Sequence, residues 1–257
     1  MMKVVAIHSY KGGTGKTSVA ANLAVTLALK GASVCLLDYD FRAPSLQVLF
    51  KPTSTSWVND YLEGKCELNK TLTDLTDRYK LRGRLRVGLA DPSSKAMREM
   101  MTKDRAWEMR ALHKTLDAKT SLAEDFKIDY LIFDTSPGVH YSAVNALAAS
   151  DYVILVMKAD EFDLEGTREL VHGVYDTLGR KTGILLNKIP LNQELLQGGP
   201  EETTKYLERT LGLPSIGIIG CFCELMAMGG KSILALERPE HPFSRSIRDI
   251  AIRIEQL

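Results

Sequence analysis

The chain of 257 residues has only four cysteines, and Cys221 and Cys223 are the only two that lie close together. Four cysteines are too few for the disulfide framework of a small secreted protein. The N-terminus offers a short apolar run before polar residues, which does not make a secretory signal. No apolar run approaches the ~18 residues that a membrane-spanning helix needs. A net charge of +1 creates no overall field for nucleic acid or an acidic membrane. We therefore expect a cytoplasmic protein.

Short runs rich in Val, Ile and Leu alternate with segments of helical composition. The apolar runs are hydrophobic on both faces, as strands of a helix-covered parallel sheet are, and they lie at residues 3–9, 33–40, 130–136, 152–158, 182–188 and 215–220. The helical segments lie at residues 16–30, 139–149, 163–178 and 246–257, and Asp163 is the predicted N-cap of the third. This order predicts an α/β fold with a mostly parallel central sheet flanked by helices. Residues 51–127 break the rhythm, so we expect a variable helical and hairpin region inside a single domain spanning residues 1–257.

Residues 8–18 read HSYKGGTGKTS, directly after the first predicted strand and at the start of the first predicted helix. Glycines in such a loop let backbone N–H groups turn toward phosphate oxygens, and the helix N-terminus adds partial positive charge. Lys16 can reach the β- and γ-phosphates, and the Thr17 hydroxyl is placed for Mg²⁺. The residues predicted to hold the nucleotide phosphates are Gly12, Gly13, Thr14, Gly15, Lys16, Thr17 and Ser18. The standard pattern has Gly where this chain has Tyr10.

Two other interpretations of this loop remain open. It can be a glycine-rich turn without a ligand, or a dinucleotide site in which Asp38 binds the ribose. The dinucleotide pattern fits less well, because its third glycine position is Ser18. It also leaves Lys16 and Thr17 without a role.

The segment KGGTGKT resembles the deviant Walker A loop of the MinD/ParA ATPases. In that family the lysine at the position of Lys11 reaches across a dimer interface to phosphates held by the other subunit, and Gly is not needed at position 10. The resemblance runs from residue 3 to about residue 256 and is loose over 51–127. It implies a three-layer P-loop NTPase fold, ATP and Mg²⁺ as cofactors, a homodimer formed on ATP binding, and catalytic roles for Lys11 and Lys16.

Three acids lie at the ends of the second and third predicted strands. Asp38 and Asp40 are one residue apart, so alternation puts them on the same side. Asp134 ends an apolar strand, where a lone carboxylate meets Mg²⁺ directly or through water. By the resemblance, Asp40 orients the attacking water, Asp38 joins Thr17 and Asp134 at the metal, and the Gly138 N–H senses the γ-phosphate. Solvated acids at strand ends are the alternative.

The run GILLNKIP (183–190) bears on which base is bound. P-loop GTPases read guanine with an N-K-x-D sequence, and this chain has Pro190 in place of the Asp. By the resemblance, Asn187 pairs with the adenine amino group. We therefore expect ATP.

Three features concern partners. Cys221 and Cys223 can bind a soft metal in a dimer, although small residues near the base are the commoner interpretation. Cations alternate along residues 78–86, which predicts a basic face if the segment is extended; it is a candidate DNA surface or a charged edge strand. The last helix carries mixed charge, so no stable membrane anchoring is expected.

Together these features predict an ATP-binding and ATP-hydrolysing switch that dimerises on ATP. Such a switch regulates the localisation, partitioning or assembly of a protein partner that the sequence does not name. Two alternatives remain: a metallocentre-maturation ATPase that uses Cys221 and Cys223, and an ATP-binding scaffold with little turnover.

Overall fold

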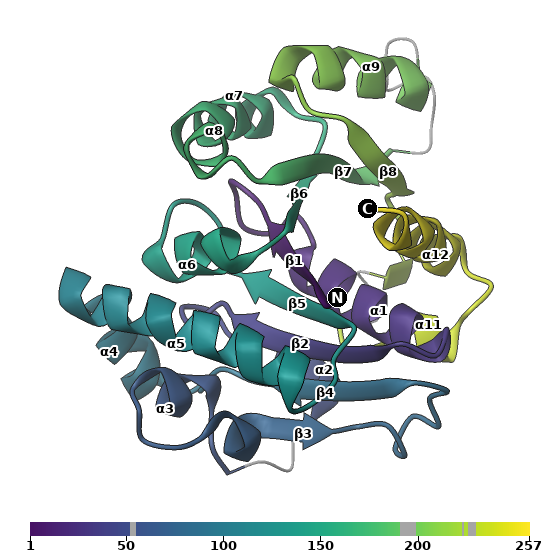
Figure 1. Ribbon diagram of the computed structural model, residues 1–257. Helices are drawn as coiled ribbons and strands as arrows, with labels where there is room; N and C mark the ends of the chain where they lie inside the picture. Colours follow the sequence, from purple (N-terminus) through teal and green to yellow (C-terminus); the bar gives the residue numbers. More distant parts are fainter. Residues whose placement is uncertain (52–54, 191–198, 223, 226–229) are drawn as a thin grey trace.

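The computed structural model describes residues 1–51, 55–190, 199–222, 224–225 and 230–257 (Figure 1). Its strands are β1 (Lys3–His8), β2 (Ser33–Tyr39), β3 (Leu72–Asp74), β4 (Arg84–Gly88), β5 (Tyr130–Thr135), β6 (Tyr152–Met157), β7 (Lys181–Ile189) and β8 (Ser215–Gly220). The longer helices are α1 (Lys16–Leu29), α4 (Ser94–Met101), α5 (Arg105–Glu124), α6 (Tyr141–Ala149), α7 (Glu161–Leu170), α9 (Gly199–Leu211) and α12 (Pro242–Glu255). Shorter turns are α2 (Leu46–Phe50), α3 (Val58–Leu62), the 3₁₀ turn η1 (Leu68–Thr71), the π-helical turn η2 (Val171–Tyr175), α8 (Asp176–Leu178) and α11 (Leu234–Glu237).

The strands form one sheet in the order β3-β4-β2-β5-β1-β6-β7-β8. Every neighbouring pair is parallel except β3 and β4, which are antiparallel at one edge. The chain reverses its direction of winding at β1, which lies between β5 and β6. Ligands of open parallel sheets bind beyond the carboxyl ends of the strands at such a point, and the HSYKGGTGKTS loop leaves β1 there.

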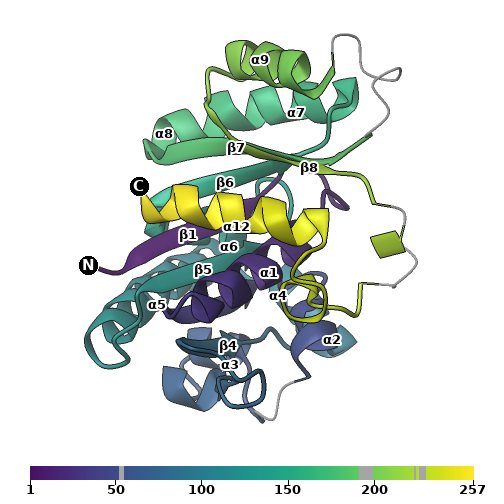
Figure 2. The same ribbon diagram turned by 90° about the vertical axis from the view of Figure 1, so that its right-hand side faces the viewer.

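Alternating side chains of each strand pack under different helices, which makes three layers. Val5 and Ile7 of β1 join a core cluster with α1, α11 and α12, whereas Val4 and Ala6 join a cluster with α5, α6 and α7. Figure 2 shows α1 and α12 crossing one face of the sheet, with α5 and α6 behind it. The predicted three-layer α/β fold with a mostly parallel sheet is confirmed.

One local prediction was wrong, and the condition attached to another is not met. Asp163 is not the N-cap of α7: the Asp160 side chain accepts the capping bond from the Asp163 N–H at 2.9 Å, and Asp163 is buried inside the first turn. Residues 78–83 are not extended, because Lys80 adopts a left-handed conformation with φ of 51° in the turn before β4. The alternation of cations therefore makes no continuous basic face, and β4 lies inside the sheet, where β3 covers its outer edge.

Across the described ranges, no helix combines the length and apolar character that crossing a membrane requires.

Candidate nucleotide-binding site

The loop between β1 and α1 has the backbone of a phosphate cradle. Gly13 and Gly15 have φ of 76° and 96°, a region that side chains with a Cβ rarely adopt. Gly15 precedes α1, whose first turn has neither a capping side chain nor an acidic residue. The first N–H groups of a helix lack intrahelical partners, so this end of α1 is left ready for an anion. Gly12 is exposed beside it.

Lys16 is the buried cation of this cradle. Its side chain is 6% exposed, and its ammonium group donates a hydrogen bond to the Ser9 hydroxyl at 2.9 Å. Burial lowers the pKa of Lys16, while the nearby carboxylates of Asp134, Asp40 and Asp163 oppose that effect. The ammonium group therefore lies among the predicted acids, inside its own subunit's loop.

The three predicted acids converge beside Lys16. Asp38 and Asp134 are register partners at the carboxyl ends of adjacent strands β2 and β5, and both are buried. Asp40 follows them; its Oδ1 accepts the Ala43 N–H at 3.1 Å, and its own N–H donates to Asp38 at 3.0 Å. Burial and the Asp134 charge raise the pKa of Asp38, and burial raises the pKa of Asp134 to about 7.

This acid cluster fits a divalent cation. Both carboxyl oxygens of Asp134 and Oδ2 of Asp38 are buried without a hydrogen-bond partner. Buried polar groups are normally satisfied, and carboxylate oxygens are the ligands that Mg²⁺ prefers. Thr17 lies against Asp134, whose pKa its hydroxyl lowers, and the hydroxyl oxygen accepts a 3.3 Å hydrogen bond from Ser45. A cation beside Thr17, Asp38 and Asp134 would meet the orphaned oxygens.

Gly138 is held at the other side of the cradle. It follows β5 with φ of 72°, and its N–H donates to the Ser9 carbonyl at 2.9 Å. Its carbonyl accepts a 3.0 Å hydrogen bond from Nε2 of His8. The group predicted to sense the γ-phosphate is therefore engaged by the chain itself in this conformation.

Lys11 and Tyr10 turn away from the cradle toward α7. The Lys11 ammonium lies 5.2 Å from the centre of the Phe162 ring, and the Phe162 side chain is 80% exposed. The Tyr10 ring packs directly on Gly166, where an added Cβ would overlap it. The two lysines of the loop thus occupy different places: Lys16 is buried within the cradle, and Lys11 is half-buried against Phe162.

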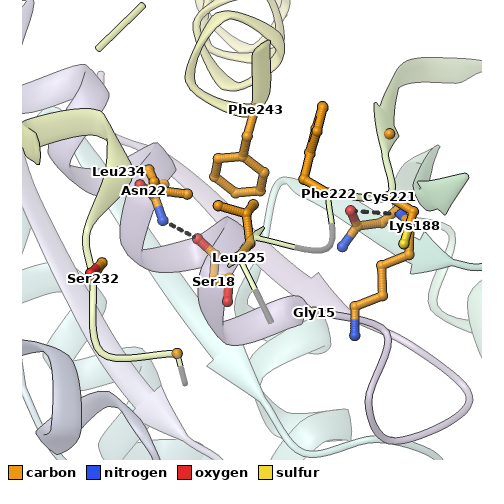
Figure 3. A pocket seen from close by; sticks show the side chains of 13 residues that line it. Gly15, Ser18, Asn22, Lys188, Cys221, Phe222, Leu225, Ser232, Leu234 and Phe243 are labelled. Carbon is orange, nitrogen blue, oxygen red and sulfur yellow. Dashed lines mark hydrogen bonds between the residues drawn. The ribbon is translucent and has the colours of Figure 1, made fainter. Parts of the chain in front are cut away.

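A pocket of about 240 Å³ opens next to the cradle, on the side of β7 and β8. Its lining includes Gly15, Ser18, Asn187, Phe222 and Phe243. Figure 3 shows the rings of Phe222 and Phe243 among the side chains that line it, with the long side chain of Lys188 running toward the phosphate loop near Gly15. A planar base fits between apolar walls of this kind.

Asn187 lies where the pocket meets the phosphate loop. Its Nδ2 donates to the Thr14 carbonyl at 2.7 Å, and its Oδ1 accepts the Lys188 N–H at 2.9 Å. Lys188 adds a second bond from its ammonium group to the Gly13 carbonyl at 2.7 Å. Both ends of the amide are engaged within the chain, so adenine recognition by Asn187 stays a prediction.

Comparison with known proteins agrees with this geometry. Residues 2–182, more than half of the chain, match the family model described as an AAA domain. The septum site-determining protein MinD of Thermotoga maritima is 26% identical over 99% of this chain and 88% of its own length. The chromosome partitioning protein ParA of Myxococcus xanthus is 27% identical over 92% of this chain and 87% of its own length. The chain belongs to the MinD/ParA family of P-loop ATPases.

Solved structures agree on the fold of this ATPase. MinD complexed with Mg-ADP from Pyrococcus horikoshii superposes with a TM-score of 0.78 over 100% of this chain and 97% of that one, at 21% identity. A ParA family ATPase from Chlorobium tepidum gives 0.75 over 98% of each chain, at 18% identity. ATP and Mg²⁺ are the ligands expected of the ATPase site.

Sequence reasoning missed several residues of the ATPase site. Ser9 binds the Lys16 ammonium, Ser45 bonds to Thr17, and Lys188 fastens the phosphate loop. Asn22 of α1 joins Ser18 to α11, since its Nδ2 donates to the Ser18 carbonyl and its Oδ1 accepts the Ala235 N–H. Ser45 and Lys188 each lie close in sequence to a residue that the motifs singled out, so the motifs offered a way to find them. For Asn22 the sequence offered only the helical pattern of its segment.

Two cysteines were predicted as possible metal ligands. Cys221 lines the pocket of about 240 Å³ beside the cradle, and Cys223 lies outside the described residues. Among the described residues no three His, Cys, Asp or Glu side chains are arranged to hold a metal ion by themselves; the cation site described above has two carboxylates, Asp38 and Asp134, and the Thr17 hydroxyl. Arg42, which follows the acids of β2, donates to Nε2 of His140 at 3.0 Å and so links the segments that follow β2 and β5.

Proposed function

We propose that this protein is an ATP-dependent switch. Two subunits close on two nucleotides, hydrolysis opens them, and the cycle controls where a protein partner is placed. The observation that carries the proposal is the separation of the two loop lysines: Lys16 is buried among acids, whereas Lys11 is half-buried beside the exposed Phe162 ring. A cation that packs on α7 and not in its own phosphate loop is free to serve a neighbouring chain.

The residues divide the work in the following way. The helix N-terminus of α1 and Lys16 hold the phosphates, and the carboxylate of Asp40 orients the attacking water. Bound Mg²⁺ neutralises charge on the phosphates. Lys11 of the partner subunit adds a second positive charge as the transition state forms; an equivalent arginine finger contributes about 10³–10⁵ in rate elsewhere.

The relatives' names suggest the kind of output. MinD of T. maritima is a septum site-determining protein, ParA of M. xanthus is a chromosome partitioning protein, and FleN of Pseudomonas aeruginosa, 31% identical over 61% of this chain and 50% of its own length, is an antiactivator. We propose that this chain likewise regulates the localisation or partitioning of a partner.

Alanine variants of the two lysines test the proposal. Lys16→Ala should lose nucleotide binding in calorimetry. Lys11→Ala should bind ATP as the wild type does, yet stay monomeric in size-exclusion chromatography with light scattering and lose turnover. Lys181→Ala is the matched control, because this exposed lysine begins β7 at the opposite end of the strand from the site. Normal ATP hydrolysis by Lys11→Ala would remove the cross-subunit role.

A further inference from the structure

His8, the last residue of β1, is completely buried and makes hydrogen bonds with both ring nitrogens. Its Nε2 lies 3.0 Å from the Gly138 carbonyl, and its Nδ1 lies 2.6 Å from the Tyr175 hydroxyl. Tyr175 is the last residue of the π-helical turn η2 and is also buried. One side chain thus joins the loop after β5 to a helical turn far away in the sequence.

The hydrogen-bond partners determine the tautomer of His8. A backbone carbonyl only accepts, so Nε2 must carry the proton that it donates to Gly138. Burial lowers the pKa of His8 to about 3, so the ring is neutral near pH 7 and Nδ1 has no proton. Nδ1 must then accept from the Tyr175 hydroxyl. The Gly138 carbonyl therefore fixes the tautomer, and the Tyr175 hydroxyl orients the ring by donating to Nδ1.

Gly138 is restrained on both sides by this arrangement. The peptide before it donates to Ser9 at 2.9 Å, and the peptide after it accepts from His8. If the Gly138 N–H is to meet a γ-phosphate, it must first leave the Ser9 carbonyl. The His8 bond opposes this change by fixing the next peptide.

We propose that His8 is a positioning residue that holds the Gly138 loop in its resting position and, through Tyr175, joins that loop to η2. The inference rests on the proposed function, because it takes Gly138 as the γ-phosphate contact. ADP leaves the restraint in place, whereas ATP must displace it, so His8 sets part of the balance between the two nucleotides. π-Helical turns are frequent at functional sites. In the chain η2 follows directly after α7, and Tyr10 packs on Gly166 of α7.

The test weakens the restraint without touching the nucleotide. Tyr175→Phe removes only the hydroxyl that orients the His8 ring, while His8→Asn removes the bond to Gly138 outright. A hydrogen bond contributes about 0.5–1.5 kcal/mol, so affinity for a non-hydrolysable ATP analogue should rise about two- to tenfold relative to ADP. Calorimetry with Mg²⁺ present measures both affinities, and ADP affinity should not change.

A second readout needs no nucleotide. Nitrogen NMR of the nucleotide-free wild type should show His8 as the Nε2–H tautomer. Tyr175→Phe should keep that tautomer, because the Gly138 carbonyl still requires the proton on Nε2, but shift the Nδ1 resonance, which loses its hydrogen bond. Tyr61→Phe is the matched control: Tyr61 is buried and its hydroxyl donates to the Lys114 carbonyl at 2.8 Å. This control should leave the spectrum of His8 and both affinities as in the wild type.

The possible outcomes separate the two proposals. An Nδ1–H tautomer in the wild type overturns the role of His8, and so does an unchanged ratio of affinities in Tyr175→Phe. Equal changes in ADP and analogue affinity also overturn it, because they indicate general loosening. A wild type that binds neither nucleotide overturns the proposed function, and the tautomer measurement then still decides the hydrogen bonding of His8.

Discussion

The Lys11 ammonium group lies 5.2 Å from the centre of the Phe162 ring, at the start of α7. A cation over an aromatic face gains about 0.5–1 kcal/mol at an exposed site. The contact holds Lys11 against its own chain. If Lys11 serves a second subunit, as we propose, it must first leave the ring, so the contact opposes the proposed dimerisation by about its own free energy.

Replacing Phe162 with alanine should make ATP-dependent dimerisation easier. Because the ring no longer holds Lys11, the dimer dissociation constant should fall about two- to fivefold. Analytical ultracentrifugation with ATP, in an Asp40→Ala background to block hydrolysis, measures this constant. Tyr206→Ala, an exposed aromatic on α9, is the control. Weaker dimerisation of Phe162→Ala would show that the ring contacts the second subunit instead.

Tyr10 and Gly166 form a second pair in contact. This contact should reverse the usual effect on the free energy of unfolding when alanine replaces a helical glycine. Alanine in place of glycine inside an exposed helix normally stabilises by about 1 kcal/mol. At Gly166 the added Cβ would overlap the Tyr10 ring, and such overpacking costs about 1–3 kcal/mol. Gly166→Ala should therefore lower the free energy of unfolding, as urea denaturation measures it.

The control for this pair is a double variant. Tyr10→Gly restores the residue of the standard phosphate-loop pattern and removes the ring, so Gly166→Ala added to it should stabilise. Equal effects of Gly166→Ala in the two backgrounds would contradict the contact.

Much of the site could be predicted from the sequence because its chemistry is local. The glycines, Lys16 and Thr17 lie in one loop, and Asp38 and Asp134 end parallel strands whose carboxyl ends share an edge of the sheet. The three layers could also be predicted, because strands that are apolar on both faces must be covered by helices on both sides of the sheet. Short-range geometry decides all of these features.

The long-range contacts could not be predicted in this way. His8 meets Tyr175, and Tyr10 meets Gly166, only because α7 and η2 pack beside the loop, and one sequence contains no sign of that packing. The Asp163 error has another cause. Asp160 and Asp163 are both residues that cap helices well. The buried Asp163 carboxylate accepts the Lys158 N–H instead, and Asp160 is left to cap α7.

Burial of His8 should make the stability of the protein depend on pH. Its pKa is lowered to about 3 in the folded chain from the ordinary histidine value of 6.5. Between these values the unfolded state binds the proton, so His8 opposes folding increasingly as pH falls below 6.5. Below pH 6.5, each further pH unit lowers the free energy of unfolding by about 1.4 kcal/mol.

Comparison of the wild type with His8→Asn isolates this contribution. Between pH 7 and pH 5 the wild type should lose about 2 kcal/mol more of its free energy of unfolding than the variant does. Urea denaturation at both pH values measures the difference, since the carboxylates titrate alike in the two proteins. Parallel pH profiles would mean that the pKa of His8 is the same in the folded and unfolded chain.

Asn187 provides a test of how the base is selected. Its amide fastens Thr14 and Lys188 at 2.7 Å and 2.9 Å, so Asn187→Ala should leave the Thr14 carbonyl unsatisfied and loosen the phosphate loop. An unsatisfied buried group costs about 1–3 kcal/mol, so affinity for ATP and GTP should fall together, roughly 5- to 150-fold. Calorimetry with both nucleotides measures the two losses, and Asn59→Ala is the control, because this buried amide accepts the Asp91 N–H away from the site. If ATP affinity falls while GTP affinity holds, Asn187 reads adenine directly, and the fastening of the loop is secondary.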